Sequence, residues 1–431
     1  MRFQFRSVFA AWAPARVAKV CALGLLLAPG IVLAGPLGLT LSEATRLAVD
    51  RAPMLDARRA KVEAAEQESH RAGALPDPKL TFGIQDLPID TADAFNPGVD
   101  SFTMKKVGLM QEIPARAKRR ARQAVADRTI DEAEALTVAE QLAVRRSAAQ
   151  AWVSVWAAER ELGELQSLRE QSALAIGISK ARLAGGTGSA VDTMATQATA
   201  LELDNRIDAA QAALDAARDT LGRWLGADPA TLTVSDVSPN FDVLPISEAR
   251  LLSSIDRQAP LLPWQSREAV AAAEVDLATA EKHPDWSVGV SYGQRDRYSE
   301  LLTVQIGVSL PLFPRNRQDR GISARRADLD AVVASHEDAR RAQVEAVGRA
   351  LAEWNGLKRQ VARKEEDMLP LAKDRAQTAI ASYRGGGDLQ PWLEARRVEI
   401  ELHVELARHL GDLGRAWAAL AYLLPNEEMR P

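Results

Sequence analysis

A long uninterrupted helical stretch is the strongest constraint that the sequence places on the fold. Residues 115–184 contain no proline and only two glycines, Gly163 and Gly177. A helix of about 70 residues extends roughly 100 Å, which is longer than a compact domain allows. Residues 315–384 form a second such stretch, in which Pro370 is expected to kink or break the helix. The sequence therefore predicts an extended, mostly helical protein.

Each long stretch ends in a glycine-rich turn followed by a shorter return helix. The turns are Gly185-Gly186-Thr187-Gly188 and Gly385-Gly386-Gly387. In the return helices, apolar residues recur at alternating spacings of three and four, which is typical of a coiled-coil seam. The two seams are Ile207, Ala210, Leu214, Ala217 and Leu221, and Leu406, Leu410, Leu413, Trp417 and Leu420. We expect two helical hairpins, over about 115–226 and 315–424.

These features belong to an internal repeat with a shift of roughly 200 residues. Leu41-Ser42-Glu43-Ala44 recurs as Ile246-Ser247-Glu248-Ala249, and Pro76-Asp77 recurs as Pro284-Asp285. The segment before each long stretch and the turn after it correspond in the same order. We therefore predict two structural repeats, at 35–240 and 241–431. Thr40 and Glu43 have the spacing of a capping box and predict a helix start.

Between the first helix and the long stretch of each repeat, the apolar pattern changes to a period of two, which predicts a pair of strands. The strands are expected at about 79–86 and 102–113, and at about 286–294 and 301–311. Leu302, Val304, Ile306 and Val308 show the clearest alternation. Lys105 and Lys106 interrupt the pattern of the second strand, so the sequence leaves its phase open.

The first 34 residues have the features of an export signal. Four positive and no negative residues precede an apolar stretch, which ends in Val32-Leu33-Ala34-Gly35, and we expect cleavage after Ala34. The alternative is a buried N-terminal helix. The net charge is −4, and it becomes more negative once the signal with its positive residues is removed. An exported acidic chain without a recognisable nucleic-acid motif excludes nucleic acid as a partner.

Four strands with one apolar and one polar face are too few to close a barrel by themselves. Open edges are not tolerated in a bilayer, because each unpaired backbone group costs several kcal/mol there. Three copies would supply roughly twelve strands and enclose a lumen, so we expect a homotrimer. The lumen would be lined by Gln85, Ser291, Thr303, Gln305 and Ser309. The alternative is a water-soluble β-layer that carries helices.

This order of elements resembles the outer membrane efflux protein family, the TolC-like channels, over residues 38–425. The residues that carry the resemblance are Leu75-Pro76-Asp77-Pro78, Gln111-Glu112-Ile113-Pro114 and the two tip motifs. The resemblance implies a mostly α fold with a β-barrel part. A trimeric, twelve-stranded barrel in the outer membrane of a Gram-negative bacterium would continue into a helical barrel in the periplasm. Such a duct works with a periplasmic adaptor and an inner-membrane pump of the RND type. It catalyses no reaction and needs no cofactor.

Phe82–Pro88, Asp100–Met104 and the Gln-Glu-Ile-Pro run are most similar to the branch that serves heavy-metal cation pumps. Drug efflux and type I secretion through the same duct remain alternatives. The five histidines lack metal-ligand spacing, and Met104 and Met110 are more typical of strand packing than of copper ligation. A periplasmic adaptor would have one hairpin instead of two. An enzyme in a helical bundle is disfavoured, because no nucleophile–base pair or phosphate loop is found.

The resemblance also assigns roles at the helical tips. The tip glycines, which would form the adaptor-docking surface, are Gly185, Gly186, Gly188, Gly385, Gly386 and Gly387. The periplasmic gate would consist of Asp192, Tyr383, Arg384, Asp388 and Glu394. Asp388 stands where the family namesake has an arginine, which predicts a cation-favouring tip. Alternatively, Asp192 and Asp388 only complement helix dipoles.

Basic residues crowd the start of both long helices, where they oppose the helix dipole. The two clusters contain Arg116, Lys118, Arg119, Arg120 and Arg122, and Arg315, Arg317, Arg320, Arg325 and Arg326. Their place just past the strands predicts contact with lipid phosphates at the membrane edge. A solvated basic face is the alternative.

Overall fold

The computed structural model describes residues 38–90, 92, 94–385 and 390–425. The expected export signal at 1–34 lies outside the described residues. All of the described elements belong to the unit Gly38–Pro431. None of the helices in its described part combines the length and the apolarity that a transmembrane helix requires.

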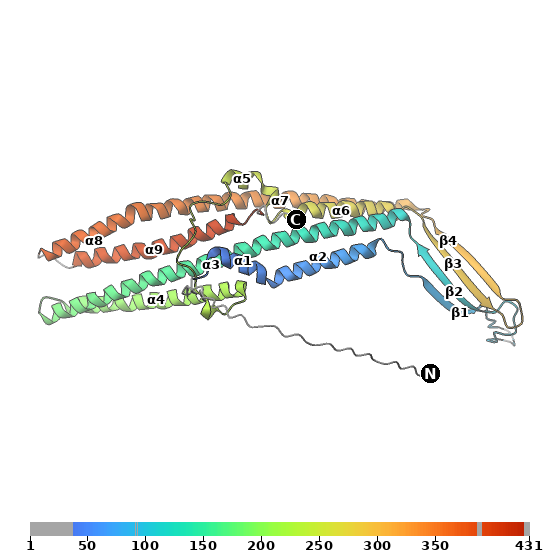
Figure 1. The fold of residues 1–431 in the computed structure, drawn as a ribbon, viewed down its shortest axis with the longest axis horizontal. Coiled ribbons are helices and arrows are strands. Elements are labelled where there is room, and N and C mark those ends of the chain that lie inside the picture. Colours follow the sequence, from blue (N-terminus) through green and yellow to red (C-terminus); the bar gives the residue numbers. More distant parts are fainter. Residues whose placement is uncertain (1–37, 91, 93, 386–389, 426–431) are drawn as a thin grey trace, which may run out of the picture. The chain divides into compact units, whose positions relative to one another are not determined.

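The same order of elements occurs twice along the chain (Figure 1). The first set is α1 Leu41–Arg51, α2 Pro53–Ala72, β1 Lys79–Gln85, β2 Met104–Ile113, α3 Arg116–Ala184 and α4 Ala190–Leu225. The second set is α5 Glu248–Ser253, α6 Leu262–Ala280, β3 Asp285–Gln294, β4 Leu301–Ser309, α7 Gln318–Arg363, α8 Leu369–Arg384 and α9 Gln390–Ala421. Three short 3-10 helices lie at Pro229–Thr231, Ile255–Arg257 and Pro314–Asn316.

Local sequence signals account for the main helix boundaries. The predicted capping box is confirmed, because Thr40 accepts a hydrogen bond from the Glu43 backbone and the Glu43 side chain accepts one from the Thr40 backbone. The first helix is shorter than a continuous pattern suggests, since Pro53 forces Ala52 into an extended conformation and starts α2. The return helix α4 ends at Gly226, which has a left-handed backbone with φ of 58°.

The interruption expected at Pro370 is confirmed. A π-helical turn, Lys364–Met368, separates α7 from α8. Proline lacks the N–H that an α-helix interior requires, so the hydrogen-bond ladder must be rearranged nearby. Lys364 is buried at this turn, and its Nζ donates to Oε2 of Glu405 on α9 at 2.6 Å. The ion pair ties the irregular turn to the return helix.

The helices are arranged around α3, which contacts α2 and α6 along one part of its length and α4 and α9 along another (Figure 1). The second repeat adds α7 next to α6 and α9, and α8 next to α9. The lateral order is therefore α2, α3, α6, α7 towards the sheet and α4, α3, α9, α8 towards the tips. The predicted seam residues Leu214, Leu221, Leu413 and Leu420 are buried.

An aromatic cluster fixes the connection between the repeats to the middle of the helices. Trp152 and Trp156 stack, and Phe241 of the connection lies between Trp156 and Trp417. The indole N–H groups of Trp156, Trp354 and Trp417 donate to the backbone carbonyls of Asp236, Phe241 and Val243. The connection is therefore held by both apolar packing and hydrogen bonds.

The four strands form one antiparallel sheet in the order β1-β2-β3-β4. The central pair, β2 and β3, joins the two repeats, with Leu109 opposite Val290. The outer strands β1 and β4 each have a free edge in the described part of the chain.

Candidate functional site

The register of the sheet sorts its side chains into two chemically different faces. Directly opposed residues in antiparallel strands point to the same side. One row across the four strands is Leu80, Leu109, Val290 and Val304, and the next row along the same face is Phe82, Val107, Tyr292 and Leu302. The row between them, on the opposite face, is Thr81, Gly108, Ser291 and Thr303. One face is thus apolar and the other is small and polar.

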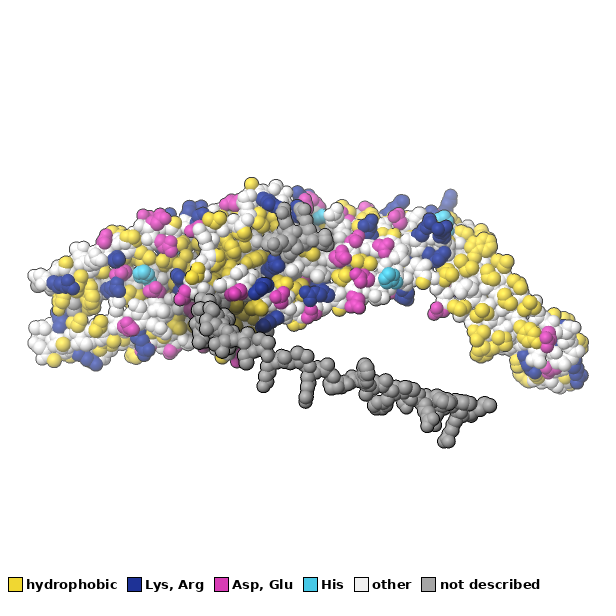
Figure 2. All heavy atoms as spheres, in the orientation of Figure 1, with side chains coloured by type: hydrophobic (Ala, Val, Ile, Leu, Met, Phe, Trp, Pro, Cys, Tyr) yellow, Lys and Arg dark blue, Asp and Glu magenta, His cyan; other side chains and the backbone are white. Residues whose placement is uncertain are grey.

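Both faces are uncovered. The apolar face leaves Phe82 80% and Leu302 72% exposed, and no helix of the described chain packs against the sheet. Figure 2 shows hydrophobic side chains spread over this region. A continuous exposed apolar surface of this kind marks contact with a membrane or another protein.

The structure resolves the phase of β2 that the sequence left open. Lys105 lies opposite Ile84 and Gln294, so it belongs to the apolar face at the end of the strand, and its Nζ lies 3.1 Å from Oδ1 of Asp296. Lys106 lies on the polar face, where its Nζ donates to Oε1 of Gln85 at 3.2 Å. The two lysines therefore point to opposite sides.

All five residues expected to line a lumen lie on the polar face. Gln85, Ser291, Thr303, Gln305 and Ser309 have the same parity as Thr81 and Gly108 in the register. The sequence interpretation missed Lys79, Lys106 and Glu112, which share this face, and Lys79 forms an ion pair with Glu112. The alternation in β1 could have placed Lys79, whereas the positions of Lys106 and Glu112 depend on the phase of β2.

The first tip is a tight reversal between α3 and α4. Gly186 has a left-handed backbone with φ of 75°, and the N–H groups of Thr187 and Gly188 both donate to the Arg182 carbonyl at 3.0 Å. A side chain at Gly188 would clash with the Arg182 backbone. Ser189 then caps α4. Asp192 lies in the first turn of α4.

The second tip is described only in part. Gly385 ends α8, and its N–H donates to the carbonyls of Ala381 and Ser382 at 3.1 Å. Tyr383 is 42% exposed, and Arg384 is the last residue of α8. Gly386, Gly387 and Asp388 lie outside the described residues. Glu394 forms an ion pair with Arg397 at 3.1 Å within α9.

A groove of about 440 Å³ lies between the two hairpins near the tips. Gly188 of the first tip and Glu394 of the second both line it, so the structure brings these two predicted residues to one surface. Arg396 crosses between the hairpins, with Nε donating to Oε1 of Gln171 at 3.0 Å.

The two basic clusters lie where the sheet passes into the long helices. Arg116, Arg120, Arg315 and Arg317 are exposed, whereas Arg119 is half-buried and its Nε has no described acceptor. Lys118 is different, because its Nζ donates to Oδ2 of Asp285 at 2.7 Å. The same carboxylate accepts from the Ala115 backbone at 2.8 Å and so caps α3.

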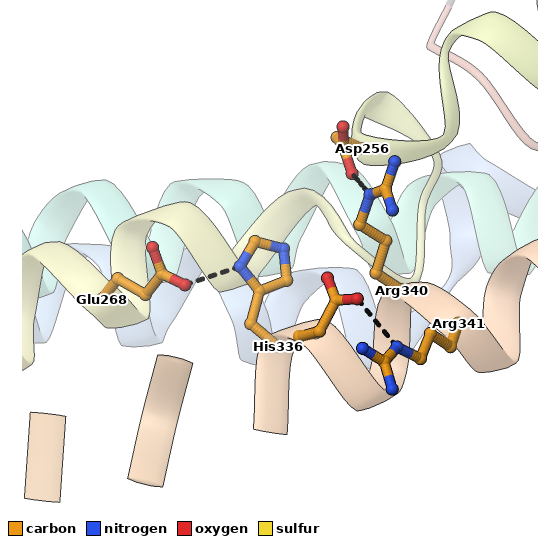
Figure 3. A network of polar contacts seen from close by, with 6 residues as sticks. Asp256, Glu268, His336, Arg340 and Arg341 are labelled. Atoms are coloured by element: carbon orange, nitrogen blue, oxygen red, sulfur yellow. Dashed lines mark hydrogen bonds and ion pairs between the residues drawn. The ribbon is translucent and has the colours of Figure 1, made fainter. Parts of the chain in front are cut away.

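A polar network links α6 and α7 away from both ends (Figure 3). Nδ1 of His336 lies 2.6 Å from Oε1 of Glu268, and the His336 ring stacks on Trp264. Arg340 pairs with Asp256 at 3.0 Å. The described residues contain no group of three or more His, Cys, Asp or Glu side chains arranged to hold a metal ion. We interpret the network as a contact between neighbouring helices.

Several solved structures share this fold. The outer-membrane channel OprN is 18% identical, with 89% of each chain covered and a TM-score of 0.73. The outer membrane protein VceC from Vibrio cholerae is 16% identical, with 89% of this chain and 96% of that one covered and a TM-score of 0.72. CusC, described as forming a transmembrane channel, is 14% identical, with coverages of 90% and 93% and a TM-score of 0.74. At these identities the similarity defines the fold.

The sequence itself adds a family match. Residues 44–227 match the model of the outer membrane efflux protein family. This match covers less than half of the chain, and the structural neighbours add the similarity of the fold. No curated protein has a sequence that matches the chain significantly.

Proposed function

We propose that this chain is the subunit of an outer-membrane efflux channel. The observation that carries the proposal is the sheet, whose faces are apolar and polar and are both uncovered, and whose two edges are free. Such a sheet satisfies its backbone groups in a bilayer only when it is closed into a barrel. The apolar face then contacts lipid and the polar face lines the water-filled lumen.

The free edges support closure by copies of the same chain. The free edges of the sheet are those of β1 and β4. The free edges of the helical layer are those of α2 and α4 on one side and of α7 and α8 on the other. A head-to-tail contact that joins β4 of one copy to β1 of the next also brings the matching helices together. Heterologous contacts of this kind generate closed rings. Three copies form the barrel and a helical tunnel continuous with it.

The channel is the exit duct of a tripartite system. It spans the outer membrane, extends into the periplasm, and works with a periplasmic adaptor and an inner-membrane pump of the RND type. The chain consists of an export signal at 1–34 and two structural repeats at 35–240 and 241–431. The repeated order of elements supports this division. The duct transports and does not catalyse.

The tips of the hairpins form the end of the channel at which opening is regulated. The glycine turns are the docking surface for the adaptor, and the groove that Gly188 and Glu394 share supports a role for both hairpins. Asp192, Tyr383, Arg384, Asp388 and Glu394 form the gate. Glu394 pairs with Arg397 within α9, which reduces its own contribution to a cation-favouring tip.

The substrate class we propose is heavy-metal cations. It rests on the similarity of Phe82–Pro88 and Asp100–Met104 to the metal-efflux branch. Met104 and Met110 lie on the polar face, yet six residues apart on one strand, and so do not form one metal site. Drug efflux and type I secretion by the same duct are the alternatives. Metal sensitivity of a deletion strain, compared with its drug sensitivity, separates these substrate classes.

Conductance across a planar bilayer tests the channel function. Purified protein is expected to give stable single-channel steps. Protein that inserts and never conducts would contradict the proposal. The gate is tested with the double variant Asp192→Ala plus Asp388→Ala, which is expected to lose cation selectivity. Unchanged selectivity would reject the acidic gate and leave the channel function intact.

A further inference from the structure

The helix-side edge of the sheet has the layered chemistry of a membrane surface. Beyond the apolar strands, Trp286 of β3 is 50% exposed and Phe313, after β4, is 83% exposed. Arg315 and Arg317 follow Phe313 within four residues. An apolar band, then exposed aromatic rings, then cations matches the order of hydrocarbon, interface and phosphate in a bilayer.

The cations at this edge come from both repeats. Arg116 and Arg120 begin α3 after β2, and Arg315 and Arg317 precede α7 after β4. The ends of β2 and β4 are separated by one strand, or about 10 Å. The four side chains are exposed, and none of them has an ion pair or hydrogen bond with any described residue. Figure 2 shows Lys and Arg side chains gathered where the helices meet the sheet.

Several cations elsewhere in the fold are neutralised within the chain. At the opposite edge of the sheet, Lys105 pairs with Asp296, and Arg295 donates to the carbonyls of Ser299 and Ser101. Further along α7, Arg325 pairs with Glu274 and Asp328. What sets the four arginines apart is that they combine the lack of a described acidic partner with a place directly beyond the ends of β2 and β4.

Three acidic side chains at this edge are already paired within the chain: Asp285 with Lys118, Glu112 with Lys79, and Asp319 with Lys282. Asp285 accepts hydrogen bonds from Lys118 and from the Ala115 backbone, which caps α3. The positive end of the α3 dipole is thus already satisfied, and the remaining positive charge belongs to the arginine side chains. An external anion would complement it.

We propose that Arg116, Arg120, Arg315 and Arg317 form a collar that binds the phosphate of anionic phospholipid headgroups in the leaflet that faces the helices. Guanidinium groups bind phosphate in a bidentate manner, which favours arginine at such a site. The inference rests on the proposed function, because headgroups flank the apolar band only when the sheet lies in a bilayer.

Lipid binding to the full-length protein in nonionic detergent tests the collar. Native mass spectrometry measures the affinity for phosphatidylglycerol and for phosphatidylcholine. Wild type is expected to prefer phosphatidylglycerol. The variant with all four arginines changed to glutamine is expected to lose about fivefold in that affinity for each arginine at low ionic strength. Arg325→Gln, an arginine with partners inside the chain, is the matched control and should bind like wild type.

Several results would overturn the collar. One is equal binding of the two lipids by wild type, and another is an unchanged phosphatidylglycerol affinity in the fourfold variant. A third is complete displacement of the lipid by equimolar inorganic phosphate, because that would identify a soluble anion as the ligand. If the fourfold variant does not fold, Arg116→Gln/Arg120→Gln and Arg315→Gln/Arg317→Gln are measured separately, and each is expected to lose about 25-fold. Planar-bilayer conductance without lipid preference refutes the collar alone. Lipid preference without conductance refutes the channel.

Discussion

Single residues decide the two irregular points of the long helices, the tip turn and the π-helical turn. Gly186 has a positive φ that only glycine adopts without strain, and Lys364 places a buried cation at the turn before Pro370. Gly186 therefore acts through the backbone conformation that it permits, and Lys364 acts through its ion pair with Glu405.

Gly186→Ala is expected to destabilise the first tip. Adding Cβ at a φ of 75° costs about 1 kcal/mol. Gly185→Ala is the control, since Gly185 has a φ of −79° and ordinary contacts around a Cβ. Hydrogen exchange of the tip amides in both variants measures the effect. Equal exchange would show that the left-handed turn does not limit the tip.

The Lys364–Glu405 pair predicts a pH-dependent stability. The hydrogen bond from Lys364 lowers the pKa of Glu405 below its usual 4.5, against a smaller opposing effect of burial. A lowered carboxyl pKa stabilises the fold above pH 4.5, and that contribution is lost as the pH falls through the folded-state pKa. Glu405→Gln should therefore destabilise at pH 7 by about 1 kcal/mol or less, because the carboxylate is half exposed.

Thermal unfolding at pH 7 and at pH 3.5 checks this prediction. The loss of stability caused by Glu405→Gln should be smaller at the lower pH. Glu401→Gln is the control, because the Glu401 carboxylate lies 3.9 Å from Arg206, which is too far for a hydrogen bond. A loss from Glu405→Gln that is the same at both pH values would exclude the ion pair as its origin.

At the scale of elements, the sheet and the helical hairpins have different origins of stability. The hairpins bury Leu214, Leu221, Leu413 and Leu420 within one chain. The sheet buries almost nothing, and its apolar residues are exposed on a single face. In the proposed channel, the strands therefore depend on a bilayer and on neighbouring copies in a way that the hairpins do not.

A charged side chain introduced at either of two adjacent positions on β4 should have different effects on assembly. Val304 lies on the apolar face and Thr303 on the polar face. Val304→Arg is expected to cost about 2–4 kcal/mol at the bilayer midplane, whereas Thr303→Arg faces the lumen and should alter ion selectivity. Heat-modifiable mobility of the membrane-inserted protein measures assembly. Equal assembly of the two variants would contradict the two-faced arrangement.

Many of the helices and strands could be predicted from the sequence. Period-two alternation located β3 and β4, and the scarcity of breakers located α3, because both are local signals. The phase of β2 could not be read from adjacent Lys105 and Lys106, since it depends on pairing with Ile84 and Gln294. The capping of α3 by Asp285 and the tryptophan contacts to 236–243 join residues far apart in the chain, and no local pattern indicates them.

For the whole molecule, the decisive feature is that every open edge lies on one of two sides. We propose that the edges of the sheet and of the helical layer match, so that one rotation between copies closes both. A single chain has no other means of pairing the edge of β1 or β4 within its described residues. In the proposed channel, assembly is therefore a condition for membrane insertion.

The mass of the folded particle in mild detergent, determined by light scattering with the detergent contribution subtracted, tests this most directly. We predict a particle of three chains that inserts into lipid vesicles. A stable, fully folded single chain that does not enter bilayers would contradict it.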